Sequence, residues 1–234
     1  MASNEKAMVL SSFIGDALAL GVHWIYNTNI IDRKLGRVSD MVKPIVDSWH
    51  PTKEAGEFTH YGDQTLVLLS SLGQSGDFKV EDFADQWKKL FKDYNGYIDK
   101  ATKGTLENFQ SGSAPAQAGA ASTDLAGAAR IAPLIYLLRD NEAALVEAAR
   151  TQTAMTHNVP EVVDAADFFA RVSLWVLKGE NPVSAITRAV RTRFNRAPFA
   201  DWVGKGIDSA DKDTRSTLLE FGQRYEYGTP IPSV

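Results

Sequence analysis

Apolar residues recur along most of the chain at three- and four-residue spacing, the periodicity of helices that bury one face. This spacing first links Met8 to Trp24 and predicts an N-terminal helix with a single apolar stripe. It predicts further helices over residues 65–72, 80–94, 142–155, 161–177, 183–194 and 214–224. We find no convincing alternating strand between them, so the pattern predicts one all-α domain.

The stretch from Leu125 to Leu138 is apolar almost all round, which is typical of a central buried helix. Pro133 should kink or break that helix. Two segments lack helical periodicity: residues 43–61 are rich in Pro, Gly and His, and residues 110–122 are rich in Gly, Ala and Ser. We expect both to be loops or tightly packed backbone.

Composition narrows the classes of function. The chain has 234 residues, of which 44% are hydrophobic and 23% charged, as in an ordinary water-soluble globule. A net charge of −4 argues against binding nucleic acid or anionic membranes by bulk electrostatics. The chain has no cysteine, so disulfides, thiolate metal sites and cysteine nucleophiles are excluded. With no signal-peptide pattern and no apolar run longer than residues 131–138, we expect a cytoplasmic protein.

Two polar clusters in the N-terminal third could carry chemistry. Asp16 lies within an apolar helical face, where a carboxylate is costly unless it is paired, coordinated or bonded to a neighbouring loop. The segment His60 to Thr65 directly precedes an apolar helical run. Loop oxygens at a helix start can hold Mg²⁺, but Asp63 is also an ordinary helix cap, and spacing alone favours the cap.

Two more clusters follow. Asp124 leads into a small-residue helix in which Arg130 is the lone charge; the arginine could bind a phosphate or carboxylate, or form a buried structural salt bridge. His157 lies just ahead of another expected helix. It could act as acid, base or ligand, although a hydrogen-bonded cap is the more frequent case for a lone histidine. None of these clusters is specific by itself.

Taken together and in order, the clusters resemble the ADP-ribosylglycohydrolase family. The matching stretches are GDALALGVHW from Gly15, YGDQTLVLL from Tyr61, AGAARIAPL from Ala126 and THNVPEVVDAA from Thr156. The resemblance implies a compact orthogonal multi-helix domain over residues 1–234, in agreement with the all-α pattern.

The resemblance also implies an activity: hydrolysis of the glycosidic bond between ADP-ribose and a protein side chain, with two Mg²⁺ or Mn²⁺ ions. The substrate would be a small-molecule or protein-linked ADP-ribosyl group; the oligomeric state is left open. The implied roles are catalytic for Asp63, His157 and His23, substrate-binding for Asp16, Arg130 and Asp124, and metal-binding for Asp63, Gln64 and Thr65.

The chain departs from the family pattern at several positions. Gly62 replaces a metal-binding Thr, Gln64 replaces a metal-binding Asp, and His23 stands where many members have an acidic residue. Leu125 and Ala126 replace an Asn-Gly pair, and the late Gly-Gly-Asp-x-Asp-Thr segment does not occur. Two explanations are open: a C-terminal truncation of a longer protein, or a divergent branch like the J1-crystallins.

We therefore interpret the chain as a metal-assisted hydrolase of an ADP-ribosyl or related nucleotide-ribosyl conjugate. The alternative is a non-catalytic protein that binds ADP-ribose or serves a structural role on the same scaffold. The substitutions at Gly62, Gln64 and His23 favour the alternative, whereas the presence of Asp16, Asp63 and the histidines favours the hydrolase. An unrelated helical interaction domain is the third and least favoured interpretation.

Overall fold

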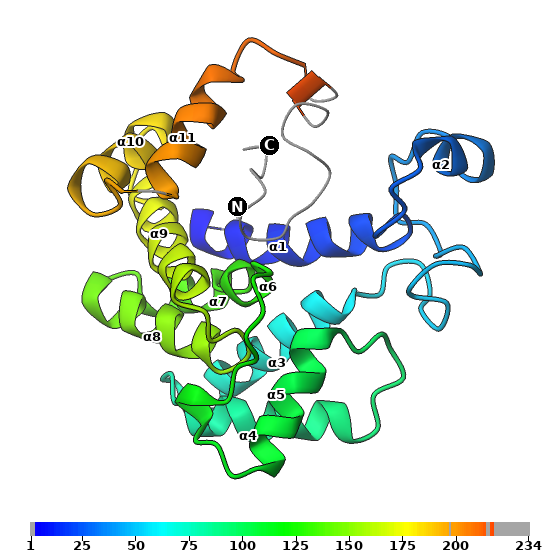
Figure 1. Cartoon of the computed structure of the whole chain (residues 1–234), viewed down its shortest axis with the longest axis horizontal. Helices are drawn as coiled ribbons and strands as arrows, with labels where there is room; N and C mark the ends of the chain where they lie inside the picture. The colour runs from blue at the N-terminus through cyan, green and yellow to red at the C-terminus, as the bar shows by residue number, and fades with distance from the viewer. Residues whose placement is uncertain (1–2, 197, 214–215, 218–234) are drawn as a thin grey trace.

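Helices dominate the computed structural model, which describes residues 3–196, 198–213 and 216–217 (Figure 1). The helices are α1 (Asn4–Leu20), α2 (Thr28–Lys34), α3 (His60–Ser75), α4 (Val80–Lys92), α5 (Lys100–Gln110), α6 (Ala126–Ala129), α7 (Ala132–Leu138), α8 (Glu142–Ala154), α9 (Pro160–Leu177), α10 (Pro182–Thr192) and α11 (Phe199–Asp208), with a 3₁₀ turn at Pro115–Gln117. The described residues contain no strand, only an isolated bridge between Ala120 and His157. The all-α prediction is confirmed.

The main core lies where α3, α4, α7, α8 and α9 meet. The long helix α9 packs along α8 and also contacts α6 and α10, while α1 lies across α7 and α3 (Figure 1). Phe83, Trp87, Leu134 and Leu174 are fully buried in this core. Truncating a buried aromatic side chain of this kind costs about 3–5 kcal/mol, so these contacts hold the scaffold on which the site is built.

The predicted central helix is two short helices rather than one. The helix α6 ends before Arg130, and α7 begins at Ala132 with Pro133 at its second position. Proline is tolerated there because the first-turn N–H groups of a helix have no intrahelical acceptor. The predicted break is thus confirmed, and Arg130 lies at this break, directly after the last residue of α6.

The first helix is shorter than predicted. It ends at Leu20, so His23 and Trp24 lie in a turn rather than on the helical stripe. A Cβ atom on Gly21 would come within 2.5 Å of the Val42 carbonyl oxygen, so only glycine allows this close approach. Trp24 has a φ of 61°, a left-handed conformation that is rare for a bulky residue and is often found at functional sites.

Three helices were not predicted: α2, α5 and α11. The helix predicted over residues 214–224 lies outside the described residues except for Ser216 and Thr217. The single domain predicted over residues 1–234 includes those residues and stays a prediction. None of the helices within the described ranges is long and apolar enough to cross a membrane.

Candidate functional site

A cavity of about 510 Å³ opens between the end of α1, the turn that follows it, the start of α3 and the segment before α7. Its wall carries the polar side chains Asp16, His23, Tyr61, Thr65, Asp124 and Arg130 among apolar ones such as Phe13, Trp24 and Leu125. A second cavity of about 450 Å³ adjoins it and includes Trp49, Tyr97 and Asp99. Trp24, Tyr26 and Asp124 line both, so the two spaces meet at these side chains.

Asp16 projects from α1 toward the start of α3. Its Oδ2 accepts a hydrogen bond from the Thr59 amide at 2.8 Å, and its Oδ1 accepts one from the Thr59 hydroxyl at 2.6 Å. The same Thr59 caps α3 by accepting from the Tyr61 amide. Burial raises the pKa of Asp16 despite these hydrogen bonds, which act in the opposite direction.

Gly62 explains how the Asp16 carboxylate can lie so close to α3. A Cβ atom at position 62 would come within 2.3 Å of Asp16 Oδ2. A threonine in the family's position therefore cannot coexist with this placement of the carboxylate. The departure from the family pattern at Gly62 has a steric reason in the structure.

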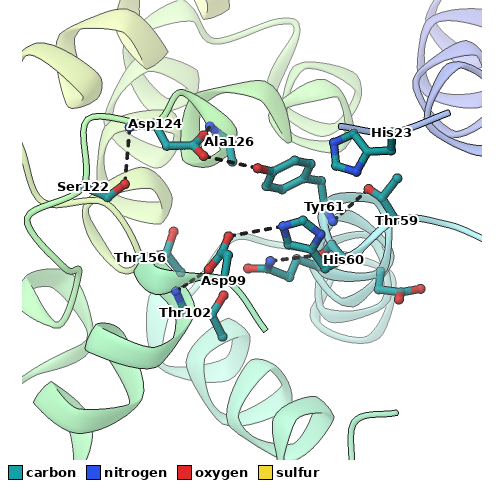
Figure 2. Close-up of polar contacts among 12 residues, drawn as sticks. His23, Thr59, His60, Tyr61, Asp99, Thr102, Ser122, Asp124, Ala126 and Thr156 are labelled. Carbon is teal, nitrogen blue, oxygen red and sulfur yellow. Dashed lines mark hydrogen bonds and ion pairs between the residues drawn. The ribbon is translucent and has the colours of Figure 1, made fainter. Parts of the chain in front are cut away.

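Asp124 stands at the junction of the two cavities. Its Oδ1 accepts from the Ala126 amide at 2.6 Å, and its Oδ2 accepts from the Tyr61 hydroxyl at 3.2 Å (Figure 2). Burial, with a smaller contribution from the charge of Asp99, raises the pKa of Asp124. Among the described residues, no lysine or arginine forms an ion pair with Asp16 or Asp124, and their hydrogen bonds all come from neutral donors; the positive charge of Arg130 acts on Asp124 only from beyond 4.0 Å.

Asp63 has different neighbours. Its Oδ2 accepts hydrogen bonds from Lys53 Nζ at 2.7 Å and from the Tyr94 hydroxyl at 2.6 Å. The Lys53 and Asp63 side chains are only 12% and 16% exposed. Burial and the donated hydrogen bond raise the pKa of Tyr94, which therefore remains a neutral donor. The ammonium group of Lys53 thus supplies the positive charge beside Asp63.

The side-chain polar atoms of Gln64 and Thr65 are already hydrogen-bonded within the protein. The Gln64 carbonyl oxygen accepts from Trp87 Nε1 at 2.8 Å and from Arg130 at 2.9 Å, and its amide nitrogen donates to the His60 carbonyl. The Thr65 hydroxyl donates to the Tyr61 carbonyl. Lys53 places a positive charge beside Asp63, and the oxygen of Gln64 and the hydroxyl of Thr65 are engaged in other hydrogen bonds. These three side chains therefore do not fit a site for two hard dications, which need free oxygen ligands. The metal-binding roles of Asp63, Gln64 and Thr65 stay a prediction that this arrangement does not favour.

Arg130 is 4% exposed and lines the first cavity. Its two terminal nitrogens donate to Gln64 and to the Thr156 hydroxyl, while its Nε has no hydrogen-bond partner. Burial lowers the pKa of Arg130 to about 10, so the guanidinium is still charged at neutral pH. No carboxylate of the described residues lies within salt-bridge distance, which leaves a buried positive charge at the cavity wall.

His157 is packed beneath α6, away from both cavities. It is 3% exposed, its Nδ1 lies 2.9 Å from the Thr156 hydroxyl, and it is absent from either cavity lining. Burial, with the charge of Arg130, lowers the pKa of His157 to about 3, so the ring is neutral. His23 does line the first cavity, and its Nδ1 lies 2.7 Å from His50 Nε2. The catalytic roles predicted for both histidines stay predictions.

Sequence reasoning missed several residues around the site, namely Lys53, Thr59, Tyr94 and His50. The role of Thr59 as a helix cap could have been predicted, because a threonine directly before a helical run is a favoured N-cap. Lys53, by contrast, meets Asp63 from a loop, and Tyr94 meets it from beyond α4, a contact 31 residues away in the chain. No local pattern encodes such contacts.

Comparisons with known proteins agree with this architecture. The ADP-ribosylglycohydrolase family model matches residues 3–231. The chain belongs to that family. Two similar relatives are from Tripedalia cystophora: Crystallin J1B, 22% identical over 97% of the chain and 73% of the relative, and Crystallin J1A, 24% identical over 76% and 59%. The predicted likeness to the J1-crystallin branch is thereby confirmed.

The family fold is also found among solved structures. A structure described as an ADP-ribosylglycohydrolase-related protein complex superimposes with a TM-score of 0.65, covering 92% of this chain and 78% of that one at 21% identity. This likeness confirms the expected family fold. Membership places the chain in a hydrolase family, whereas substrate, metal and activity are matters of proposal.

Proposed function

We propose that the protein hydrolyses the glycosidic bond of an ADP-ribosyl or related nucleotide-ribosyl conjugate, with Asp16 and Asp124 as the reacting carboxyl groups. The observation that carries this proposal is the pair of carboxyl groups on the wall of one cavity, neither of them in an ion pair with a described lysine or arginine. Glycosidic hydrolysis by side chains alone needs two carboxyls in different roles, and a raised pKa suits a proton donor.

Ligand size and charge support this substrate class. Cavities of about 510 and 450 Å³ are each within the usual range for ligand pockets, and they adjoin at Asp124. An ADP-ribosyl group would occupy the first cavity and the acceptor the second, so the bond between them would lie beside Asp124. The buried guanidinium of Arg130 would favour the anionic pyrophosphate in the first cavity.

The roles follow from the neighbours of each carboxyl group. Asp124, at the junction, would give its proton to the leaving atom of the acceptor as the glycosidic bond breaks. Asp16 accepts two hydrogen bonds from Thr59 that favour its ionised form, so it would take a proton from the attacking water. Water adds to the anomeric carbon, and the products are ADP-ribose and the free acceptor. Because the donors around Asp63 do not fit a pair of hard dications, no step is assigned to a metal.

One set of observations favours a second candidate, a non-catalytic ADP-ribose-binding protein. Lys53 neutralises Asp63, Gln64 is turned into the core, and two relatives are named crystallins. On this alternative the cavity would still bind ADP-ribose, but Asp16 and Asp124 would only hydrogen-bond to it.

Release of ADP-ribose from ADP-ribosylated protein separates the two candidates. We expect turnover by the wild-type chain and a loss of about 10²–10⁴-fold in the Asp124→Asn variant, the range for removing a general acid. Calorimetric titration with ADP-ribose should show similar affinity in both. Binding without turnover by the wild type would establish the non-catalytic candidate, and a folded protein that neither binds nor turns over would refute both.

A further inference from the structure

Three of the four histidines in the chain lie together beside the first cavity. His23 comes from the turn after α1, His50 from the loop before α3, and His60 from the first residue of α3. One ring nitrogen from each lies within 4.8 Å of the others, and His23 Nδ1 is 2.7 Å from His50 Nε2. Nothing in the proposed hydrolysis uses this cluster.

The cluster leaves buried nitrogen atoms without partners. His50 and His60 are 0% and 1% exposed, and Nδ1 of each has no hydrogen-bond partner. Buried polar atoms are nearly always satisfied, because an unpaired one loses its hydration and gains nothing in return. Three imidazoles that each bring one nitrogen within 4.8 Å of the others, in a cluster that also contains buried nitrogens without partners, are an arrangement expected of metal ligands.

Asp99 would orient one of the rings. His60 Nε2 lies 3.3 Å from Asp99 Oδ2, a close contact without the alignment of a hydrogen bond (Figure 2). A carboxylate behind the far nitrogen of a ligating imidazole is the usual second-shell partner in metal sites. The nitrogen that remains for an ion on His60 is then Nδ1.

We propose that His23, His50 and His60 bind one first-row transition-metal ion of the zinc class. Three imidazole nitrogens select Zn²⁺, Co²⁺ or Ni²⁺ over Mg²⁺, which prefers oxygen ligands. Three protein ligands leave a fourth position for a water molecule. The ion ties the turn after α1, the 43–59 loop and the start of α3 together, and so holds Trp24 and Tyr61 in the cavity wall. This site is separate from the Lys53–Asp63 pair.

The test uses the full chain after metal stripping, titrated calorimetrically with Zn²⁺ and, in a parallel arm, with Mg²⁺. We expect one equivalent of Zn²⁺ per chain and no heat from Mg²⁺ at the same concentrations. The His50→Gln and His23→Gln variants should each bind Zn²⁺ at least about 100-fold more weakly, since a ligand matters at least as much as its second-shell partner. His157→Gln is the matched control, because His157 is buried but lies outside the cluster, and it should retain full Zn²⁺ affinity.

A second arm keeps the proposal testable if a histidine variant does not fold. Asp99→Asn preserves the side-chain oxygen that caps α5, and it should weaken Zn²⁺ binding by about 10–100-fold. The wild-type chain loaded with Co²⁺ should show the intense visible absorption of a four-coordinate site. Absence of Zn²⁺ binding by the folded wild type, or equal binding by wild type and His50→Gln, would overturn the proposal and leave the rings as an aromatic stack. The readouts are the heat of metal binding and the Co²⁺ absorption, so neither depends on hydrolysis.

Discussion

Two sets of carboxylates in this protein, one fully buried and one partly buried on a cavity wall, are stabilised in different ways. Asp167, on α9, is 0% exposed and lies between three arginines: Arg171 Nε at 2.5 Å, Arg193 Nε at 2.9 Å and Arg150 at 3.6 Å. Asp16 and Asp124, on the cavity wall, receive only hydrogen bonds from neutral groups of the described residues.

The presence or absence of ion-pair partners distinguishes a structural carboxylate, Asp167, from carboxyl groups available for chemistry, Asp16 and Asp124. The charge of Asp167 is compensated within the protein, so it needs nothing further and lines no described cavity. Asp16 and Asp124 lose hydration on burial without gaining an ion-pair partner, and their pKa values rise accordingly. Carboxyl groups with raised pKa values beside a cavity are candidates for proton transfer.

The largest expected effect comes from removing a cavity carboxylate. Asp16→Asn should lower the rate of ADP-ribose release by about 10²–10⁴-fold while leaving KM nearly unchanged, because a base acts in the transition state. Asparagine can still accept from the Thr59 amide, so the local fold should persist. Steady-state kinetics measures the effect, and unaltered turnover would remove Asp16 from the proposed mechanism.

The complementary change acts on stability alone. Asp167→Ala leaves three arginines around a vacant position and should lower the free energy of unfolding by about 3 kcal/mol, the low end for a broken buried pair, because Arg150 and Arg193 are partly exposed. Urea unfolding gives this value. ADP-ribose affinity should stay at the wild-type level in the folded variant, and a large loss of affinity would contradict the separation drawn above.

Restoring the family's threonine should damage the site rather than repair it. In Gly62→Thr the new Cβ would meet Asp16 Oδ2, so we expect a loss of about 1–3 kcal/mol in the free energy of unfolding and reduced turnover. Thermal unfolding and the release assay check both parts. Gly15→Ala is the control, because a Cβ there has nothing within 4 Å. Gain of Mg²⁺-dependent turnover in Gly62→Thr would contradict the claim that threonine at position 62 damages the site.

Because the pKa of Asp124 is raised in the folded protein, its contribution to stability should decrease as pH rises. Folded Asp124 binds its proton more tightly than the unfolded chain does, so its stabilisation is complete below about pH 4 and is lost as pH rises through the folded pKa. Relative to Asp124→Asn, the wild type should therefore lose stability with rising pH, by about 1.4 kcal/mol for each unit of pKa shift. Unfolding curves over a pH series measure this, and the opposite slope would show that the carboxyl group has a depressed pKa.

The smallest effect is expected at the compensated Asp63. Lys53→Met should cost about 1 kcal/mol in the free energy of unfolding, since the Tyr94 hydroxyl still donates to Asp63 in the variant. Once its ammonium partner is gone, Asp63 should bind Mg²⁺ more tightly than in the wild type, as calorimetry would show. Equal Mg²⁺ affinity in both proteins would mean that Lys53 does not exclude the ion.

Much of the scaffold could be predicted from the sequence, because its helices carry the 3.6-residue periodicity. The helices α4, α8, α9 and α10 fall within a few residues of the predicted ranges, whereas α3 begins at His60, ahead of the predicted start at Thr65. The N-terminal helix was predicted too long, since nothing in the apolar spacing up to Trp24 indicates the close contact between Gly21 and Val42 that ends it. The short helix α2 is too brief to show a period.

The site was less predictable for a physical reason. Asp16, Asp124, Arg130 and His23 were singled out as polar residues in apolar or loop settings, and all four do line one cavity. The partners that decide their chemistry come from distant parts of the chain: Thr59 bonds Asp16 across 43 residues, and Arg130 meets Gln64 across 66. Only the folded structure shows which carboxylates have ion-pair partners and which do not.

The most direct test is the rate of ADP-ribose release from ADP-ribosylated protein by the wild-type chain in buffer free of Mg²⁺ and Mn²⁺, compared with Asp63→Asn. The account predicts turnover without either ion and at most a small change in the variant, because Asp16 and Asp124 carry the chemistry and Lys53 compensates Asp63. Turnover that appears only with added Mg²⁺ and disappears in Asp63→Asn would contradict it and assign the reaction to a metal centre at Asp63.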